Sequence, residues 1–155
     1  MNDEVRIPVA ALKGRGIAAQ TAHRFMRDER DAFDDGWGTL ESGAAEPAQP
    51  PATEVIWETA RSALTRNDSP DIFFEQAVNP YRGCEHGCVY CYARPTHSYL
   101  NLSPGIDFET RIIAKRNIAE VLRAELARPS HVPTAVNIGS ATDCYQPVER
   151  ELRLT

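Results

Sequence analysis

The sequence has no long apolar run and no basic leader, and each absence excludes a class of protein. No apolar stretch approaches the roughly 18 residues that a membrane-spanning helix needs. The N-terminus carries Asp3 and Glu4 where a secretory signal would have basic residues. We therefore expect a cytoplasmic protein that does not enter a membrane.

The sequence also lacks an overall excess of basic residues, since its net charge is -5. Residues 1–78 carry 8 Lys and Arg against 14 Asp and Glu, whereas residues 79–155 carry 9 against 8. This distribution excludes a generally basic nucleic-acid-binding protein and leaves a local basic face open in the second half. The candidates for that face could equally be solvated residues paired with carboxylates such as Asp107 and Glu109, which is the commoner outcome. These candidates are Arg82, Arg94, Arg111, Lys115 and Arg116.

The composition divides the chain into two parts near residue 53. Residues 41–53 are rich in Ala and Pro and have no hydrophobic periodicity, so they predict a linker or surface loop. Residues 1–53 are accordingly interpreted as an acidic, partly disordered N-terminal extension. Residues 54–155 are interpreted as the folded part.

Four segments of the folded part have recognisable patterns. Short apolar runs predict strands within residues 53–60 and 71–78, and the alternation of residues 134–141 predicts a buried strand. Residues 117–130 predict a helix, with Asn117 as its cap. Strands that alternate with helical segments indicate βαβ units and an α/β fold with a parallel sheet.

The cysteines carry the most specific signal. Cys84, Cys88 and Cys91 form the pattern C-x3-C-x2-C on a loop that follows a predicted strand. Three thiolates at this spacing can hold three corners of a [4Fe-4S] cube, which leaves the fourth iron open for another molecule.

Two other interpretations of these cysteines remain open on spacing alone. A structural zinc site of Cys3His type would recruit His86 or His97, although such sites usually gather ligands from two separated pairs. An electron-transfer cluster would recruit Cys144 as its fourth ligand. Neither of these sites would carry radical chemistry.

The string "GCEHGCVYCYA" at residues 83–93 resembles the cluster motif of the radical S-adenosylmethionine (SAM) superfamily. Residues 66–117 resemble a bacterial branch related to spore photoproduct lyase and described as DNA-repair-photolyase-like. The similarity extends from "KGRG" at residues 13–16 to the last residue of the chain.

The resemblance implies an enzyme with specific cofactor ligands. Cys84, Cys88 and Cys91 would hold the cluster, and SAM would chelate the remaining iron. Electron transfer would then cleave SAM to a 5'-deoxyadenosyl radical that abstracts hydrogen from a substrate. Tyr90 would stack on the adenine of SAM. The methionine end of SAM would meet residues after the next strand, although the Gly-Gly-Glu string common in the superfamily is missing here. These residues are Gly139, Ser140, Thr142 and Asp143.

Cys144 has two interpretations. Spore photoproduct lyase uses a cysteine in this region as a hydrogen-atom donor, which by resemblance makes Cys144 a candidate donor. The lyase position corresponds better to Ser140, and a free buried cysteine commonly acts as a small hydrophobic residue.

The resemblance also implies the fold and the partners. The expected fold is an incomplete (β/α)6 radical SAM partial barrel that contains the first two βα units. Members of the family continue past residue 155, so we expect the isolated chain to be marginally stable, prone to associate and inactive alone. The implied partners are an electron donor of flavodoxin or ferredoxin type and, by analogy with photoproduct repair, a nucleic-acid substrate.

Overall fold

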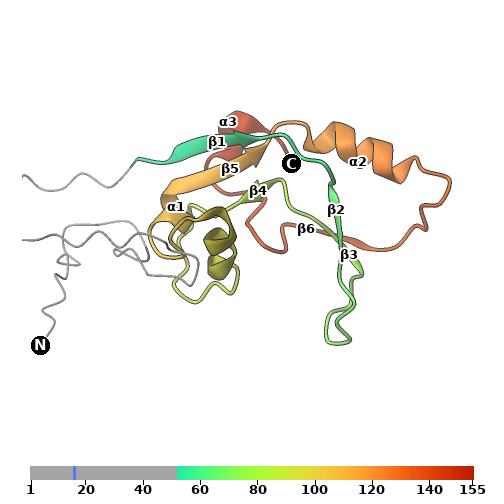
Figure 1. Cartoon of the computed structure of the whole chain (residues 1–155), viewed down its shortest axis with the longest axis horizontal. Coiled ribbons are helices and arrows are strands. Elements are labelled where there is room, and N and C mark those ends of the chain that lie inside the picture. The colour runs from blue at the N-terminus through green and yellow to red at the C-terminus, as the bar shows by residue number, and fades with distance from the viewer. Residues whose placement is uncertain (1–15, 17–51) are drawn as a thin grey trace, which may run out of the picture.

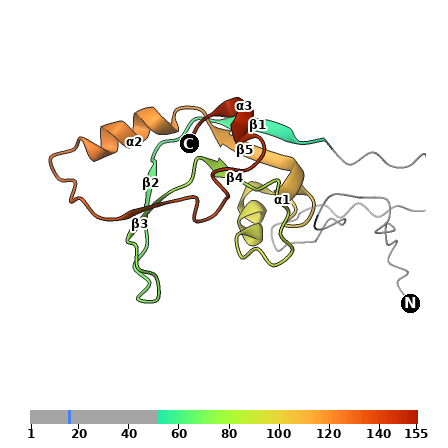
Figure 2. The same ribbon diagram turned by 180° about the vertical axis from the view of Figure 1, so that it is seen from behind.

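The computed structural model describes Gly16 and residues 52–155, which form two small mixed sheets side by side (Figures 1 and 2). The first sheet has the strand order β1-β5-β4. Strand β1 (Glu54–Glu58) runs parallel to β5 (Arg111–Lys115), and β4 (Tyr81–Arg82) runs antiparallel to β5. Four consecutive residues of β5, from Ile112 to Lys115, are buried, so β5 is the interior strand of this sheet.

The second sheet has the strand order β2-β3-β6. Strand β2 (Leu64–Arg66) runs antiparallel to β3 (Gln76–Val78), whereas β6 (Val136–Ile138) runs parallel to β3. The parallel register pairs Val78 with Ile138, so the segments that follow these two strands leave the sheet at the same edge.

Within the described part of the chain, four helical segments connect or cover the strands. The helix η2 is a 3-10 helix, and the other three are α-helices. They are η2 (Arg94–Leu100), α1 (Asp107–Thr110), α2 (Ile118–Leu126) and α3 (Glu149–Leu152). Among the described residues, no helix is both long and apolar enough to cross a membrane.

The apolar face of α2 packs against the second sheet. Ile118 is buried with Ala63 and Val78, and Val121 and Leu122 pack against the same cluster. Removing this apolar surface from water stabilises the contact between α2 and the sheet. A separate cluster of buried side chains around Tyr81 and Ile112 forms the apolar core of the first sheet.

Two details of the sequence prediction are wrong. Asn117 does not cap α2 with its side chain, because its amide pairs with the backbone of Ala60 across the core, at 2.7 Å to the Ala60 N and 2.9 Å to the Ala60 O. Strand β6 is present but is not buried: Val136 is 37% exposed and Ile138 is 52% exposed. Strand β6 lies at the edge of its sheet, where it pairs with β3 on one side.

The predicted strands and helix are present within their expected segments, as β1, β3, β6 and α2. Strands β3 and β6 are parallel neighbours, and the chain between them passes through α2. The first sheet, with β5 as its centre, was not expected. The partial (β/α)6 barrel stays a prediction, and the predicted disorder of residues 1–53 concerns a segment that, except for Gly16 and residues 52 and 53, lies outside the described residues.

Glu125 on α2 holds the start of β2 in place. One of its carboxylate oxygens accepts hydrogen bonds from the backbone N–H groups of Ala63 (3.1 Å) and Leu64 (2.8 Å). Burial alone would raise the pKa of Glu125, but these hydrogen bonds, together with that from Ser62, hold it below its ordinary value.

We predict that Glu125→Ala lowers the free energy of unfolding by about 1–3 kcal/mol, because it leaves two backbone N–H groups without their acceptor. Urea denaturation followed by circular dichroism measures the change. Since the carboxylate is favoured in the folded state, the deficit should shrink as the pH falls below the ordinary carboxyl pKa of 4.5. Glu120→Ala, on the exposed face of the same helix, is the matched control and should have little effect. Equal deficits for the two variants would contradict this role of Glu125.

Candidate functional site

The three clustered cysteines lie on successive turns between β4 and η2. The backbone N–H of Cys84 donates to the carbonyl of Phe108 at 2.9 Å, which ties the start of the loop to helix α1. The N–H of Gly87 then donates to Cys84 O at 3.3 Å, and the N–H of Cys91 donates to Cys88 O at 3.2 Å. We call residues 83–93 the cysteine loop. The three cysteines therefore lie on one short segment that is folded by its own backbone hydrogen bonds.

The thiols of the cysteine loop differ in exposure. Cys84 is buried, Cys91 is half-buried and Cys88 is exposed, and all three are free. Burial raises the pKa of the Cys84 thiol, since desolvation disfavours its thiolate. Within residues 52–155, no three His, Cys, Asp or Glu side chains converge on a point that could hold a metal ion. The donor set fits an iron–sulfur cluster chemically, but the side chains must rearrange to bind one.

The loop after β6, residues 139–148, lies against the cysteine loop. Asn79, at the end of β3, donates from Nδ2 to Ser140 Oγ at 3.2 Å and accepts from the backbone N–H of Ala141 at 2.8 Å. The N–H of Gly139 donates to Val78 O at 2.9 Å, which continues the pairing of β3 with β6. The ends of the two parallel strands are therefore held together directly.

Two buried side chains join the interiors of the two loops. Thr142 Oγ1 donates to the carbonyl of Gly83 at 2.6 Å. Gln146 has no exposed surface; its Oε1 accepts from the N–H of Glu85 at 3.0 Å, and its Nε2 donates to Thr142 Oγ1 at 3.3 Å. Each buried polar group thus gains a partner from the other loop or from its own.

Glu85 adds a third connection from the cysteine loop. Its Oε2 accepts from the N–H of Val148 at 2.6 Å, immediately before α3. Its Oε1 accepts from Thr53 Oγ1 at 2.6 Å, immediately before β1. One carboxylate therefore fastens the cysteine loop to both α3 and β1.

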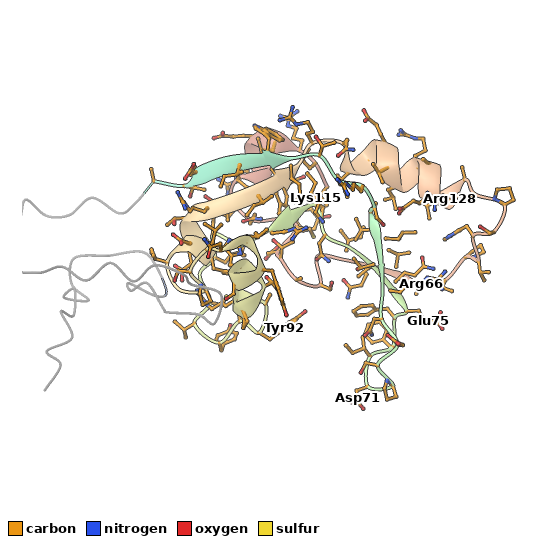
Figure 3. All side chains as sticks on the ribbon, in the orientation of Figure 1. Arg66, Asp71, Glu75, Tyr92, Lys115 and Arg128 are labelled. Atoms are coloured by element: carbon orange, nitrogen blue, oxygen red, sulfur yellow. The ribbon has the colours of Figure 1, made fainter. Side chains whose placement is uncertain are left out.

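The structure places the predicted SAM contacts on both loops. Tyr90 is 86% exposed, so its aromatic ring is accessible from solvent. The Asp143 carboxylate lies 3.2 Å from His86 Nε2, so it pairs with a residue of the cysteine loop. The Thr142 hydroxyl donates a hydrogen bond to the Gly83 carbonyl, and the Ser140 hydroxyl accepts one from Asn79 Nδ2. Tyr92, labelled in Figure 3, donates its hydroxyl proton to the Ser140 carbonyl.

Cys144 is half-buried in the loop after β6. Burial, followed by the charge of Asp143, raises the pKa of its thiol, so the protonated form is favoured. Its carbonyl accepts from Thr155 Oγ1 at 2.8 Å. Its predicted role as a hydrogen-atom donor stays a prediction.

His97, considered as a zinc ligand, is fully buried in η2. Its Nε2 lies 3.0 Å from the carbonyl of Arg111, and its ring packs edge-on against Phe108. Burial lowers the pKa of His97, so the neutral imidazole is favoured. This imidazole serves the packing between η2 and the start of β5.

Arg94 and Glu109 form an ion pair beneath the cysteine loop, and its burial was not expected from the sequence. Glu109 has no exposed surface, and Arg94 is 5% exposed. Arg94 also donates from Nε to Cys88 O at 2.9 Å and from Nη1 to Gly105 O at 3.1 Å. A buried pair of this kind is stabilised only when its remaining donors and acceptors are satisfied, as they are for Arg94.

Most of the candidate basic face is occupied by such local pairs. Arg82 pairs with Glu58 at 3.2 Å and Arg111 with Glu54 at 3.1 Å. Lys115 is 9% exposed, at the end of β5 (Figure 3). Arg82 and Arg111 are therefore partly exposed residues with carboxylate partners, as expected for a solvated face, whereas Arg94 is paired but buried.

The chain is similar to proteins of unassigned function in bacteria and archaea. Relatives in Mycobacterium tuberculosis and Mycobacterium bovis, both called uncharacterized proteins, are 54% identical over 76 residues, which is 49% of this chain and 22% of each relative. An uncharacterized protein of Methanocaldococcus jannaschii is 27% identical over 102 residues, which is 66% of this chain and 36% of the relative. The chain therefore spans about a fifth to a third of these relatives. No family model and no solved structure matches it.

We predict that Gln146→Leu lowers the free energy of unfolding by about 1–3 kcal/mol, because the Glu85 N–H loses its buried acceptor. Urea denaturation measures this loss, and hydrogen exchange of the Glu85 amide should become faster. Tyr145→Phe, next to it and 77% exposed in the parent, is the control and should change neither quantity. Unchanged exchange at Glu85 in the Leu variant would show that Gln146 does not hold the loops together.

Proposed function

We propose that this chain carries the cofactor-binding part of a radical SAM enzyme. Cys84, Cys88 and Cys91 would ligate three irons of a [4Fe-4S] cluster, and the loop after β6 would face the SAM bound at the fourth. When bound, these groups supply one-electron cleavage of SAM to a 5'-deoxyadenosyl radical, which abstracts hydrogen from a substrate.

The juxtaposition of the two loops is the observation that supports this proposal most. The cysteine loop follows the β3–β4 segment, and the loop at residues 139–148 follows β6, the parallel neighbour of β3. Ligands of α/β proteins commonly bind beyond the carboxyl ends of such neighbouring strands. Cys91 of the cysteine loop and Ala141 of the loop after β6 pack against the same buried cluster, which contains Cys84.

The side chains divide into two groups under this proposal. Thr142 and Gln146 hold the loops together and are buried. Tyr90 and Asp143 are accessible: the ring of Tyr90 would stack on the adenine, and the carboxylate of Asp143 would accept from the amino group of SAM. To do so, Asp143 must exchange its contact with His86 for one with the cofactor.

Nucleic acid remains the proposed substrate class by analogy with photoproduct repair. Because three of the five candidate basic residues already pair with carboxylates, they do not add to the support. The proposal predicts binding of oligonucleotides that weakens steeply as salt rises, measured by fluorescence anisotropy. Absence of binding at low salt would remove the nucleic-acid substrate and leave the cofactor proposal standing.

We predict that the chain, reconstituted anaerobically with iron and sulfide and reduced with dithionite, gives a [4Fe-4S]+ electron paramagnetic resonance signal that changes when SAM is added. Alanine substitution of Cys84, Cys88 or Cys91 should each reduce bound iron and abolish this signal, because each removes one cluster ligand. Cys144→Ala is the matched control and should keep both the cluster and its response to SAM.

Other outcomes would replace the proposal. A cluster that ignores SAM and is lost in Cys144→Ala would be an electron-transfer cluster with four cysteine ligands. Bound zinc without iron would assign the cysteine loop a structural metal, since zinc accepts the same thiolates and carries out no redox step.

A further inference from the structure

Gly16 is the one described residue before position 52, and it lies against the cysteine loop. Its backbone N–H donates to Glu109 Oε2 at 2.8 Å. Glu109 is fully buried, so this N–H is one of the groups that satisfy the carboxylate. The contact joins positions 93 residues apart in the chain.

The contact is close enough to require glycine at both Gly16 and Gly87. A Cβ at Gly16 would lie 1.6 Å from the carbonyl oxygen of Gly87, far inside any allowed distance. Gly87 has a φ of +63°, and a Cβ there would lie 2.6 Å from Glu109 Oε2. The backbones of two distant segments therefore meet with no side chain between them.

The Glu109 carboxylate is also connected to the cysteines through Arg94. Glu109 pairs with Arg94, and Arg94 donates to the carbonyl of Cys88 at 2.9 Å. Gly87 itself lies between Cys84 and Cys88, and its N–H donates to Cys84 O at 3.3 Å. Gly16 thus contacts the turn that separates the first two cysteines, directly through Gly87 and indirectly through Glu109 and Arg94.

We infer that Gly16 is a positioning residue of the cysteine loop. Docking of Gly16 fixes Glu109 and the Cys84–Cys88 turn, and this conformation keeps Cys84 buried. The consequence for a bound cluster rests on the proposed function, whereas the consequence for the loop does not.

The test compares Gly16→Ala with a chain that lacks residues 1–16, which removes the anchor without adding a Cβ. Gly43→Ala, in the stretch rich in Ala and Pro, is the matched control. In the metal-free chain, the rate of alkylation of buried Cys84 is measured by mass spectrometry against that of exposed Cys88. Both Gly16 variants should raise this ratio by about fivefold or more, because the local opening that exposes Cys84 becomes easier.

A second measurement on the same variants separates positioning from general stability. Urea denaturation should change little, while the reconstituted protein should lose iron to a chelator faster and show altered g-values of the reduced cluster. An alkylation ratio equal to that of the parent and of Gly43→Ala in both variants would overturn the inference. A raised ratio in chains that bind no iron at all would support the positioning of the loop and reject the proposed function.

Discussion

The arrangement of this chain around its cysteines depends on the hydrogen-bonded junction between the cysteine loop and the loop after β6. Gln146 and Thr142 fill the interior of that junction, and both bond to the Gly83–Glu85 backbone. Asn79 closes it at the strand ends. A buried donor or acceptor that loses its partner costs about 1–3 kcal/mol, so separating the loops would leave several such groups unsatisfied together. The junction is for this reason expected to form or open as a unit.

The junction also determines which groups remain for chemistry. Side chains that hold the loops are buried and already bonded, while Cys88 and Tyr90 remain exposed. On the other side, the Arg94–Glu109 pair supports the cysteine loop from within the fold, and Gly16 reaches that pair from the N-terminal part of the chain. A cluster and its ligand would accordingly sit on the exposed side of the cysteine loop, with packed structure beneath it.

Sequence patterns predicted the elements whose residues have a clear period or punctuation, such as α2 and the strands β1, β3 and β6. They missed β5, because the run Ile112–Lys115 is short, lacks alternation and follows directly on α1 without a turn signal. The cysteines were identifiable from spacing, since a ligand set is local in sequence. Their supports were not, because Gln146, Glu109 and Gly16 act through contacts between distant segments. Asn117 does occupy the N-cap position of α2, but its side chain forms no cap hydrogen bond because its amide bonds to the backbone of Ala60, which is distant in sequence.

The central claim is that the exposed side of the cysteine loop presents an open iron to SAM. Electron–nuclear double resonance of the reduced, reconstituted chain, with SAM labelled by 15N at the amino group and 13C at the carboxylate, tests this claim most directly. The account predicts hyperfine coupling to both labels, since both groups would bind the iron that the three cysteines leave open. A well-formed cluster that shows coupling to neither label would contradict it.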